Sequence, residues 1–420
     1  MMKKETPKSK GHRWVFKARF RRDAYGWSSS RLAVQRIKEA LAEIRKVRKA
    51  DAALAGEGAV AFLERLSPAL QHVDSSSGAL GTAVNRAIEQ LVPMIAGAPV
   101  DDEVRRAWLK RLFDALEADE MPYIESLGDF WGDLCVTREF ASDQAEEDLE
   151  ITRRMLAPGR RPGSFYFGTS ACLSALFKAE RFGELIEIAG GDHVYWSYRQ
   201  WAVKALAAQG RTTEALEMAE ASRRHRYKDL DIDRLGEEIL LASGRIEDAY
   251  RRFGLSANRR GTYLATLRAV AKRYPSKDRE TILRDLVAST PGEEGKWFAA
   301  AKSVGLLDQA IALARQSPCD PRTLYRAARD FADKAPAFAV EAGLLSLHWM
   351  GQGRCYELTG ADVLQAYRGS LRAARNLGDP TGVEGRIWRL LQTPGPAVEF
   401  LVRVITQYTE VADTEEATVH

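Results

Sequence analysis

The residues most able to carry chemistry lie in the first 27 positions, where cations and aromatic rings are interleaved. Arginine and lysine bind phosphate oxygens, and aromatic rings stack on unpaired bases. This mixture favours contact with single-stranded nucleic acid or RNA. The candidate binding residues are Arg13, Trp14, Phe16, Lys17, Arg19, Arg21, Arg22, Tyr25 and Trp27. The alternative is a tail that packs its rings on the first helices and leaves its charges in water.

The charge of the chain is divided unevenly between its beginning and the rest. The 420 residues hold 62 basic and 58 acidic side chains, a net charge of +4. Residues 1–50 hold 16 basic and four acidic side chains, so residues 51–420 hold 46 basic and 54 acidic ones. A basic segment on a mildly acidic body is typical of an interaction tail.

Motifs of catalysis and metal binding fail at their key positions. The four cysteines form no CxxC pair, so a zinc ribbon, a redox dithiol and a dense disulfide framework are unsupported. Residues 229–233 resemble the start of a calcium loop, but Arg234 stands where that loop needs glycine. Residues 292–297 resemble a phosphate loop, but Trp297 replaces its magnesium-binding hydroxyl residue. We expect no metal and no cofactor, and an enzyme without sequence motifs is the least favoured class.

The elements that would position the candidate residues are helices. Val34, Ile37, Leu41 and Ile44 are spaced by three and four positions, as on one face of an amphipathic helix. No alternating run with hairpin punctuation predicts a strand. The sequence therefore predicts an all-α protein.

The clearest break in the chain is residues 157–164, where two Pro-Gly dipeptides cannot continue a helix. This break predicts a basic aromatic arm at 1–27 and an N-terminal helical domain at 28–156. Residues 157–164 would then be a linker to helical repeats at 165–345. A C-terminal helical segment with a flexible acidic end would occupy 346–420.

A pattern recurs after the break: a small apolar helix, a glycine, a polar pair, and a second helix. Gly210, Gly244 and Gly305 mark three copies, and Glu180 stands at the same position in a degenerate one. Glycine at this position adopts a left-handed turn without the penalty of a Cβ atom. The pattern therefore predicts helix pairs joined by tight turns.

The spacing of 34 residues between Gly210 and Gly244 equals the tetratricopeptide period. With Trp201, Ala215 and Ala249, these positions resemble the tetratricopeptide-like helical-repeat class over residues 165–345. The chain also looks like uncharacterised bacterial helical-repeat proteins. The resemblance implies an α-solenoid, in which each helix pair covers the apolar face of the next. It also implies a protein partner bound on the concave face.

The aromatic residues of the repeats supply the candidate protein-binding groove, with Tyr195, Tyr198 and Arg199 as its residues. The leading function is thus a non-enzymatic protein–protein interaction scaffold. The alternative is a nucleic-acid-associated protein that uses residues 1–27 to bind RNA or DNA. No uncharged apolar run approaches the roughly 18 residues of a membrane helix. We expect no membrane partner and, without a secretory signal, a cytoplasmic location.

Overall fold

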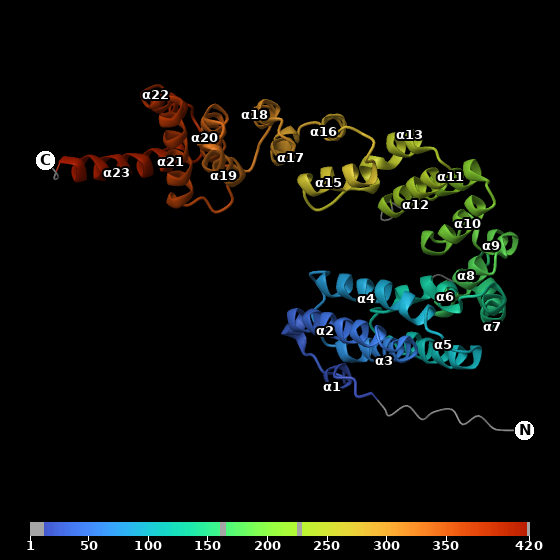
Figure 1. Cartoon of the computed structure of the whole chain (residues 1–420). Helices are drawn as coiled ribbons and strands as arrows, with labels where there is room; N and C mark the ends of the chain where they lie inside the picture. The colour runs from blue at the N-terminus through green and yellow to red at the C-terminus, as the bar shows by residue number, and fades with distance from the viewer. Residues whose placement is uncertain (1–11, 160–164, 225–228, 418–420) are drawn as a thin grey trace, which may run out of the picture. The chain divides into compact units, whose positions relative to one another are not determined.

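The computed structural model describes residues 12–159, 165–224 and 229–417, and the regular elements in these ranges are all helices (Figure 1). The predicted all-α class is confirmed for this part of the chain. No helix in it is both long and apolar enough to cross a membrane.

The chain forms two compact units. Unit 1 comprises Met1–Ile232 and Ala242–Gly244, and unit 2 comprises Asp233–Leu241 and Arg245–His420. The division therefore falls within helix α12 (Asp229–Ala242) and its end, far from the expected linker at 157–164.

Unit 1 contains the elements from α1 to α11. Their bounds are α1 Phe16–Arg19, η1 Trp27–Ser29, α2 Ser30–Arg48, α3 Ala52–Leu70, α4 Ala79–Ala96, α5 Asp102–Glu117, η2 Glu125–Phe130, α6 Trp131–Cys135, α7 Arg138–Leu156, α8 Gly168–Lys178, α9 Phe182–Ala189, α10 Trp196–Ala208, α11 Thr212–Ala221 and η3 Ser222–Arg224. The predicted stripe on α2 is confirmed, because Ile37, Leu41 and Ile44 are buried and Val34 packs against them.

One hydrophobic core runs through unit 1 from Trp14 to Ala205. It passes across the expected linker, because α7 and α8, which flank residues 157–164, pack directly on each other. Pro158 and Gly159 therefore follow the end of α7 without ending the core, and the second Pro-Gly dipeptide lies outside the described residues. Burial of apolar surface on both sides of a loop joins two segments into one unit, whatever the composition of the loop.

The predicted tight turns between helix pairs are confirmed. Backbone φ angles are positive at Gly210 (78°), Gly244 (74°), Gly305 (85°) and Glu180 (57°). The amide that follows donates to the carbonyl oxygen five residues earlier, which satisfies a helix-end acceptor. These bonds are Arg181 to Leu176 (3.0 Å), Arg211 to Leu206 (3.0 Å), Arg245 to Leu240 (2.8 Å) and Leu306 to Ala301 (3.1 Å). The fourth residue of the second helix in each pair is fully buried. These residues are Leu185, Ala215, Ala249 and Ala310.

Unit 2 contains the elements after α12. Their bounds are α13 Ile246–Ala249, the π-helix η5 Tyr250–Gly254, α14 Leu255–Ala257, α15 Tyr263–Arg273, α16 Arg279–Ala288, η6 Glu294–Trp297, α17 Phe298–Ser303, α18 Leu307–Gln316, α19 Pro321–Phe331, α20 Pro336–Gly351, α21 Gly360–Leu377, α22 Pro380–Leu391 and α23 Val398–Ala417. The core of α19 to α23 includes Leu401 and Ile405 of α23. The end that was expected to be flexible is thus helical as far as Ala417.

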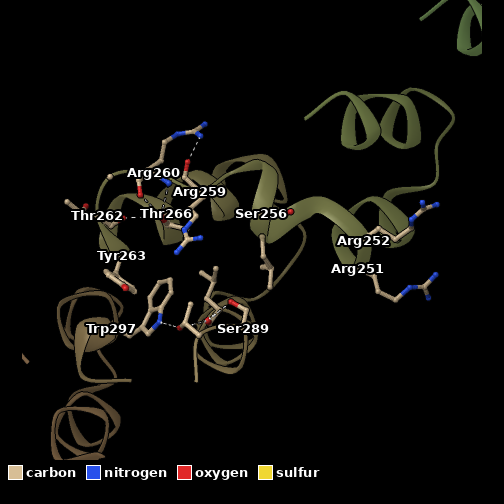
Figure 2. Close-up of a pocket in the computed structure, with 14 residues that line it drawn as sticks. Arg251, Arg252, Ser256, Arg259, Arg260, Thr262, Tyr263, Thr266, Ser289 and Trp297 are labelled. Carbon is tan, nitrogen blue, oxygen red and sulfur yellow. Dashed lines mark hydrogen bonds between the residues drawn. The ribbon is translucent and has the colours of Figure 1, made fainter. Parts of the chain in front are cut away.

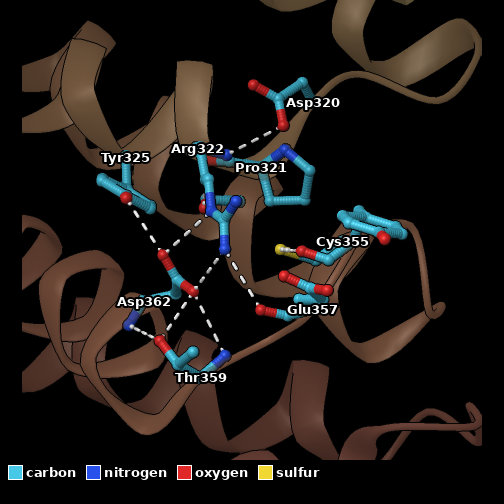
Figure 3. Close-up of polar contacts among 10 residues, drawn as sticks. Asp320, Pro321, Arg322, Tyr325, Cys355, Glu357, Thr359 and Asp362 are labelled. Carbon is cyan, nitrogen blue, oxygen red and sulfur yellow. Dashed lines mark hydrogen bonds and ion pairs between the residues drawn. The ribbon is translucent and has the colours of Figure 1, made fainter. Parts of the chain in front are cut away.

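A polar cluster joins α19 to α21 in unit 2 (Figure 3). The buried carboxylate of Asp362 accepts hydrogen bonds from Arg322 Nε (3.1 Å), Tyr325 Oη (3.1 Å) and Thr359 Oγ1 (2.8 Å). Arg322 Nη2 donates to Asp362 and to the carbonyl oxygen of Glu357, both at 3.1 Å. Arg322, and then Thr359 and Tyr325, hold the pKa of Asp362 down at about 2 against the effect of burial.

Candidate functional site

Three of the candidate aromatic rings of the N-terminal segment lie inside unit 1. Trp14 is 4% exposed, and Phe16 and Tyr25 are similarly buried. The Trp14 indole occupies the space beside Gly58 on α3, where an added Cβ would lie 2.2 Å from a ring atom. The expectation that these three rings stack on bases is therefore corrected. Burial of these rings in the apolar core is more favourable than exposure to water. This is the alternative arrangement, in which the tail packs on the first helices.

Backbone hydrogen bonds fix the same segment to its neighbours. The Glu43 carboxylate on α2 accepts from the amides of Val15 (2.7 Å) and Phe16 (3.2 Å). The amide of Asp23 donates to the carbonyl oxygen of Pro68 on α3 (3.0 Å). Residues 12–27 are thus packed and hydrogen-bonded as an integral part of unit 1.

The cations of the segment remain largely at the surface. Arg13, Lys17, Arg21 and Arg22 are exposed. Arg19 is the exception among the candidate cations, because it forms an ion pair with Glu39. One ring also stays outside: Trp27 is 73% exposed, and this candidate keeps a free face.

The three candidates of the expected protein-binding groove have different environments around the start of α10. Tyr195 is 67% exposed, whereas Tyr198 packs against the unit 1 core. Arg199 is buried, and its Nη2 atom lies 2.6 Å from the carboxylate of Asp192. Of the three, Tyr195 alone presents most of its side chain to a partner.

A cavity of about 490 Å³ in unit 2 is the better-formed candidate site (Figure 2). It lies among α14, α15, α16 and the π-helix η5. Its lining contains four arginines and no acidic residue. The lining residues are Arg251, Arg252, Leu255, Ser256, Arg259, Arg260, Gly261, Thr262, Tyr263, Thr266, Leu286, Ser289, Thr290 and Trp297.

The four arginines of this pocket differ in direction and in partners. Figure 2 shows the Arg259 side chain extending toward Ser289 and Trp297, whereas Arg251 and Arg252 lie at the far end of the pocket. Arg251 forms an ion pair with Asp248, and Arg260 Nη1 donates to the carbonyl oxygen of Arg259 (3.0 Å). Within the described residues, the guanidinium of Arg259 forms no hydrogen bond or ion pair.

The wall opposite Arg259 is held by its own hydrogen bonds. Trp297 Nε1 donates to Thr290 Oγ1 (2.8 Å), and the Trp297 ring meets Tyr263 edge-on with centroids 4.7 Å apart. Tyr263 Oη in turn donates to Glu293. Lys296 and then Tyr263, with a smaller contribution from Arg259, hold the pKa of Glu293 below its usual range. The pocket is therefore rigid on this side before any ligand arrives.

The loop before α15 is also fixed by local hydrogen bonds. The Thr262 side chain accepts from the amide of Ala265 (3.1 Å), which caps the helix start. The amide of Arg260 donates to Thr266 Oγ1 (2.9 Å). The π-helix η5, which carries Arg251, is a rare element that occurs often at functional sites.

Sequence reasoning missed this pocket although the sequence contains its signal. Residues 249–277 include eight basic side chains and no acidic one. Its cations are spread over two helices, η5 and α15, and the connections beside them, so they form no stripe on a single helix. Only the fold brings Arg259 from one of these connections opposite Ser289 and Trp297.

Three of the cysteines of the chain are buried in the described part of the structure. Burial raises the pKa of the thiols of Cys135, Cys172 and Cys319 to about 12, so they stay protonated and unreactive at neutral pH. The described part of the chain also contains no cluster of three His, Cys, Asp or Glu residues that could hold a metal ion.

The class that the fold defines is an all-α protein with helix pairs joined by left-handed turns. Comparison of the chain with protein-family models, with curated proteins and with solved structures finds no match. The function is therefore inferred from the chemistry of the residues described above.

Proposed function

We propose that the protein is a non-enzymatic interaction scaffold whose unit 2 binds an acidic segment of a protein partner in the arginine-lined pocket. The observation that carries this proposal is the lining itself, with four arginines and no carboxylate. An acidic residue of the partner would form a bidentate pair with the guanidinium of Arg259. The hydroxyl groups of Ser289 and Thr290 would supply further contacts.

The size and walls of the pocket favour a short peptide segment over a nucleic acid strand. A volume of about 490 Å³ is within the range of pockets that enclose one compact ligand. Its two aromatic residues, Tyr263 and Trp297, are already packed edge-on against each other. A strand of several nucleotides would instead need a long groove and free ring faces.

The repeated turns support the finer part of the proposal, an α-solenoid of tetratricopeptide-like helix pairs. In three of the turns, the arginine that follows the left-handed residue forms an ion pair with the acidic residue three positions later. These pairs are Arg181 with Glu184, Arg211 with Glu214, and Arg245 with Asp248. In such an array, each pair adds surface for a protein partner.

The proposal is tested with a fluorescent oligo-glutamate peptide and the full-length protein. The change is Arg259→Gln, and Arg279→Gln on α16 is the matched control, because Arg279 is exposed and lies outside the pocket lining. Loss of one charged hydrogen-bond donor should weaken peptide binding about tenfold, whereas the control should bind like the unmodified protein. Anisotropy titration at constant salt measures both.

Two results would contradict the proposal. If Arg259→Gln and Arg279→Gln weaken binding equally, the peptide responds to the overall charge of unit 2. If the unmodified protein does not bind the acidic peptide, the pocket is not an acidic-peptide site.

A further inference from the structure

The surface formed by residues 12–38 of unit 1 carries a charge that its own acids do not neutralise. Three acids lie between positions 12 and 50, and each already has a partner. Asp23 pairs with His72 (3.3 Å), and Glu39 pairs with Arg19 and Arg36. Glu43 accepts backbone amides, as described above.

The cations that remain form what we name the basic face. Its members are exposed and form no ion pair or hydrogen bond through their side chains with another described residue. They are Arg13, Lys17, Arg21, Arg22, Arg31 and Lys38. Six unpaired cations on one continuous stretch of 27 residues create a field that attracts polyanions.

Trp27 lies between Arg22 and Arg31 of the basic face in the sequence, and its backbone is fixed. Its backbone carbonyl oxygen accepts the amide of Asp74 (3.0 Å), which fixes the position of the residue on unit 1. Its ring is nevertheless 73% exposed. An exposed ring on a fixed backbone provides a stacking platform with little loss of conformational entropy.

We propose that the basic face binds single-stranded nucleic acid, with phosphates on its six cations and one base stacked on Trp27. This site differs from the one expected from sequence, because Trp14, Phe16 and Tyr25 are buried and Arg31 and Lys38 are added. A lipid surface is the less favoured polyanion. Insertion into a bilayer needs a broad apolar surface, and the large apolar side chains that residues 12–38 expose are limited to Val15, Trp27 and Leu32, with Phe16 and Phe20 in the core.

The first measurement is the salt dependence of binding to a fluorescent oligouridylate. Each phosphate contact on a single strand contributes a slope of about −0.7 to log K against log salt. Six contacts would weaken binding roughly 300-fold between about 50 and about 200 mM salt. A slope near zero would overturn the proposal.

The second measurement compares variants of equal charge loss. Arg21→Gln with Arg22→Gln removes two members of the basic face, and Arg86→Gln with Arg154→Gln removes two exposed arginines elsewhere in unit 1. The first pair should make the slope shallower by about 1.4, and the second should leave it unchanged. Equal effects of the two pairs would overturn the proposal in favour of non-specific charge.

The third measurement separates stacking and lipid binding. Trp27→Ala should weaken oligouridylate binding about tenfold without changing the salt slope, because the lost contact carries no charge. Sedimentation with phosphatidylserine vesicles tests the other polyanion. Binding to vesicles without binding to oligouridylate would overturn the proposal. None of these assays uses the unit 2 pocket, so they remain decisive if the acidic-peptide proposal fails.

Discussion

Arg322 and Arg259 of unit 2 show how one residue type serves two purposes. Arg322 donates to Asp362 and to the carbonyl oxygen of Glu357, and so joins α19 to the start of α21 (Figure 3). Arg259 extends into a cavity without a hydrogen-bond or ion-pair partner among the described residues (Figure 2). The first arginine stabilises the fold, and the second leaves its hydrogen-bonding capacity for a ligand. A count of arginines cannot separate these roles, but their partners can.

Trp14 and Trp27 show the same contrast within unit 1. They are 13 positions apart in one basic segment, yet Trp14 is 4% exposed and Trp27 is 73% exposed. Burial makes the first a structural residue, and exposure makes the second available to a ligand. Substitutions in these two pairs therefore test whether burial and hydrogen-bond partners separate structural residues from ligand-binding ones.

The largest effect is expected for Trp14→Ala. Removal of a buried indole from the site beside Gly58 should lower the free energy of unfolding by about 3–5 kcal/mol. Urea unfolding followed by circular dichroism measures the loss. Trp27→Ala is the matched change at an exposed ring and should alter the free energy by less than about 0.5 kcal/mol. Similar losses in the two variants would mean that residues 12–27 are not packed as described.

A smaller decrease in the free energy of unfolding is expected for Arg322→Ala. This change leaves the buried carboxylate of Asp362 with Thr359 and Tyr325 alone. Removal of one partner of a fully buried ion pair costs about 3–5 kcal/mol. Because the Arg322 side chain is 34% exposed, solvent screens part of this cost, and we expect urea unfolding to show a smaller loss than for Trp14→Ala. A loss below about 0.5 kcal/mol would show that solvent replaces the guanidinium without penalty.

The sequence predicted the local part of this architecture. The apolar stripe of α2 and the left-handed turns at Gly210, Gly244 and Gly305 depend on neighbouring residues, so their spacing was sufficient. The burial of Trp14 depends on Gly58, 44 positions away, whose missing side chain makes room for the indole. That pairing is tertiary, and the composition of the segment left both a ligand and packing on the first helices open.

The candidate sites were predictable to different degrees. Arg13, Lys17, Arg21 and Arg22 are exposed as a basic binding segment requires, since charged side chains seldom enter a core without partners. Arg199 was not predictable as a buried residue, because its partner Asp192 lies outside the helix that carries it. The unit 2 pocket needs the packing of α15 against α16, which no periodicity specifies.

The pH dependence of stability should report the Arg322 cluster. The pKa of Asp362 is about 2 in the folded protein and about 3.9 in an unfolded chain. A lowered carboxyl pKa contributes stability that is complete above the unfolded value and is lost as the pH falls through the folded value. Stability should therefore decline from about pH 4 to about pH 2. In Asp362→Asn this decline should be shallower in urea titrations at each pH, and an unchanged slope would assign the acid sensitivity to other carboxyl groups.

Arg259→Gln should change stability as little as Trp27→Ala, and it therefore tests the contrast between Arg259 and Arg322 directly. A guanidinium without a structural partner contributes little to the fold, so the free energy of unfolding should change by less than about 0.5 kcal/mol. The same variant should lose oligo-glutamate binding about tenfold. A loss of stability above about 1 kcal/mol would mean that Arg259 holds the pocket together, as Arg322 holds α19 to α21. Binding lost at constant stability would instead identify Arg259 as a ligand-binding residue, because an arginine that the fold does not use is then required for the ligand.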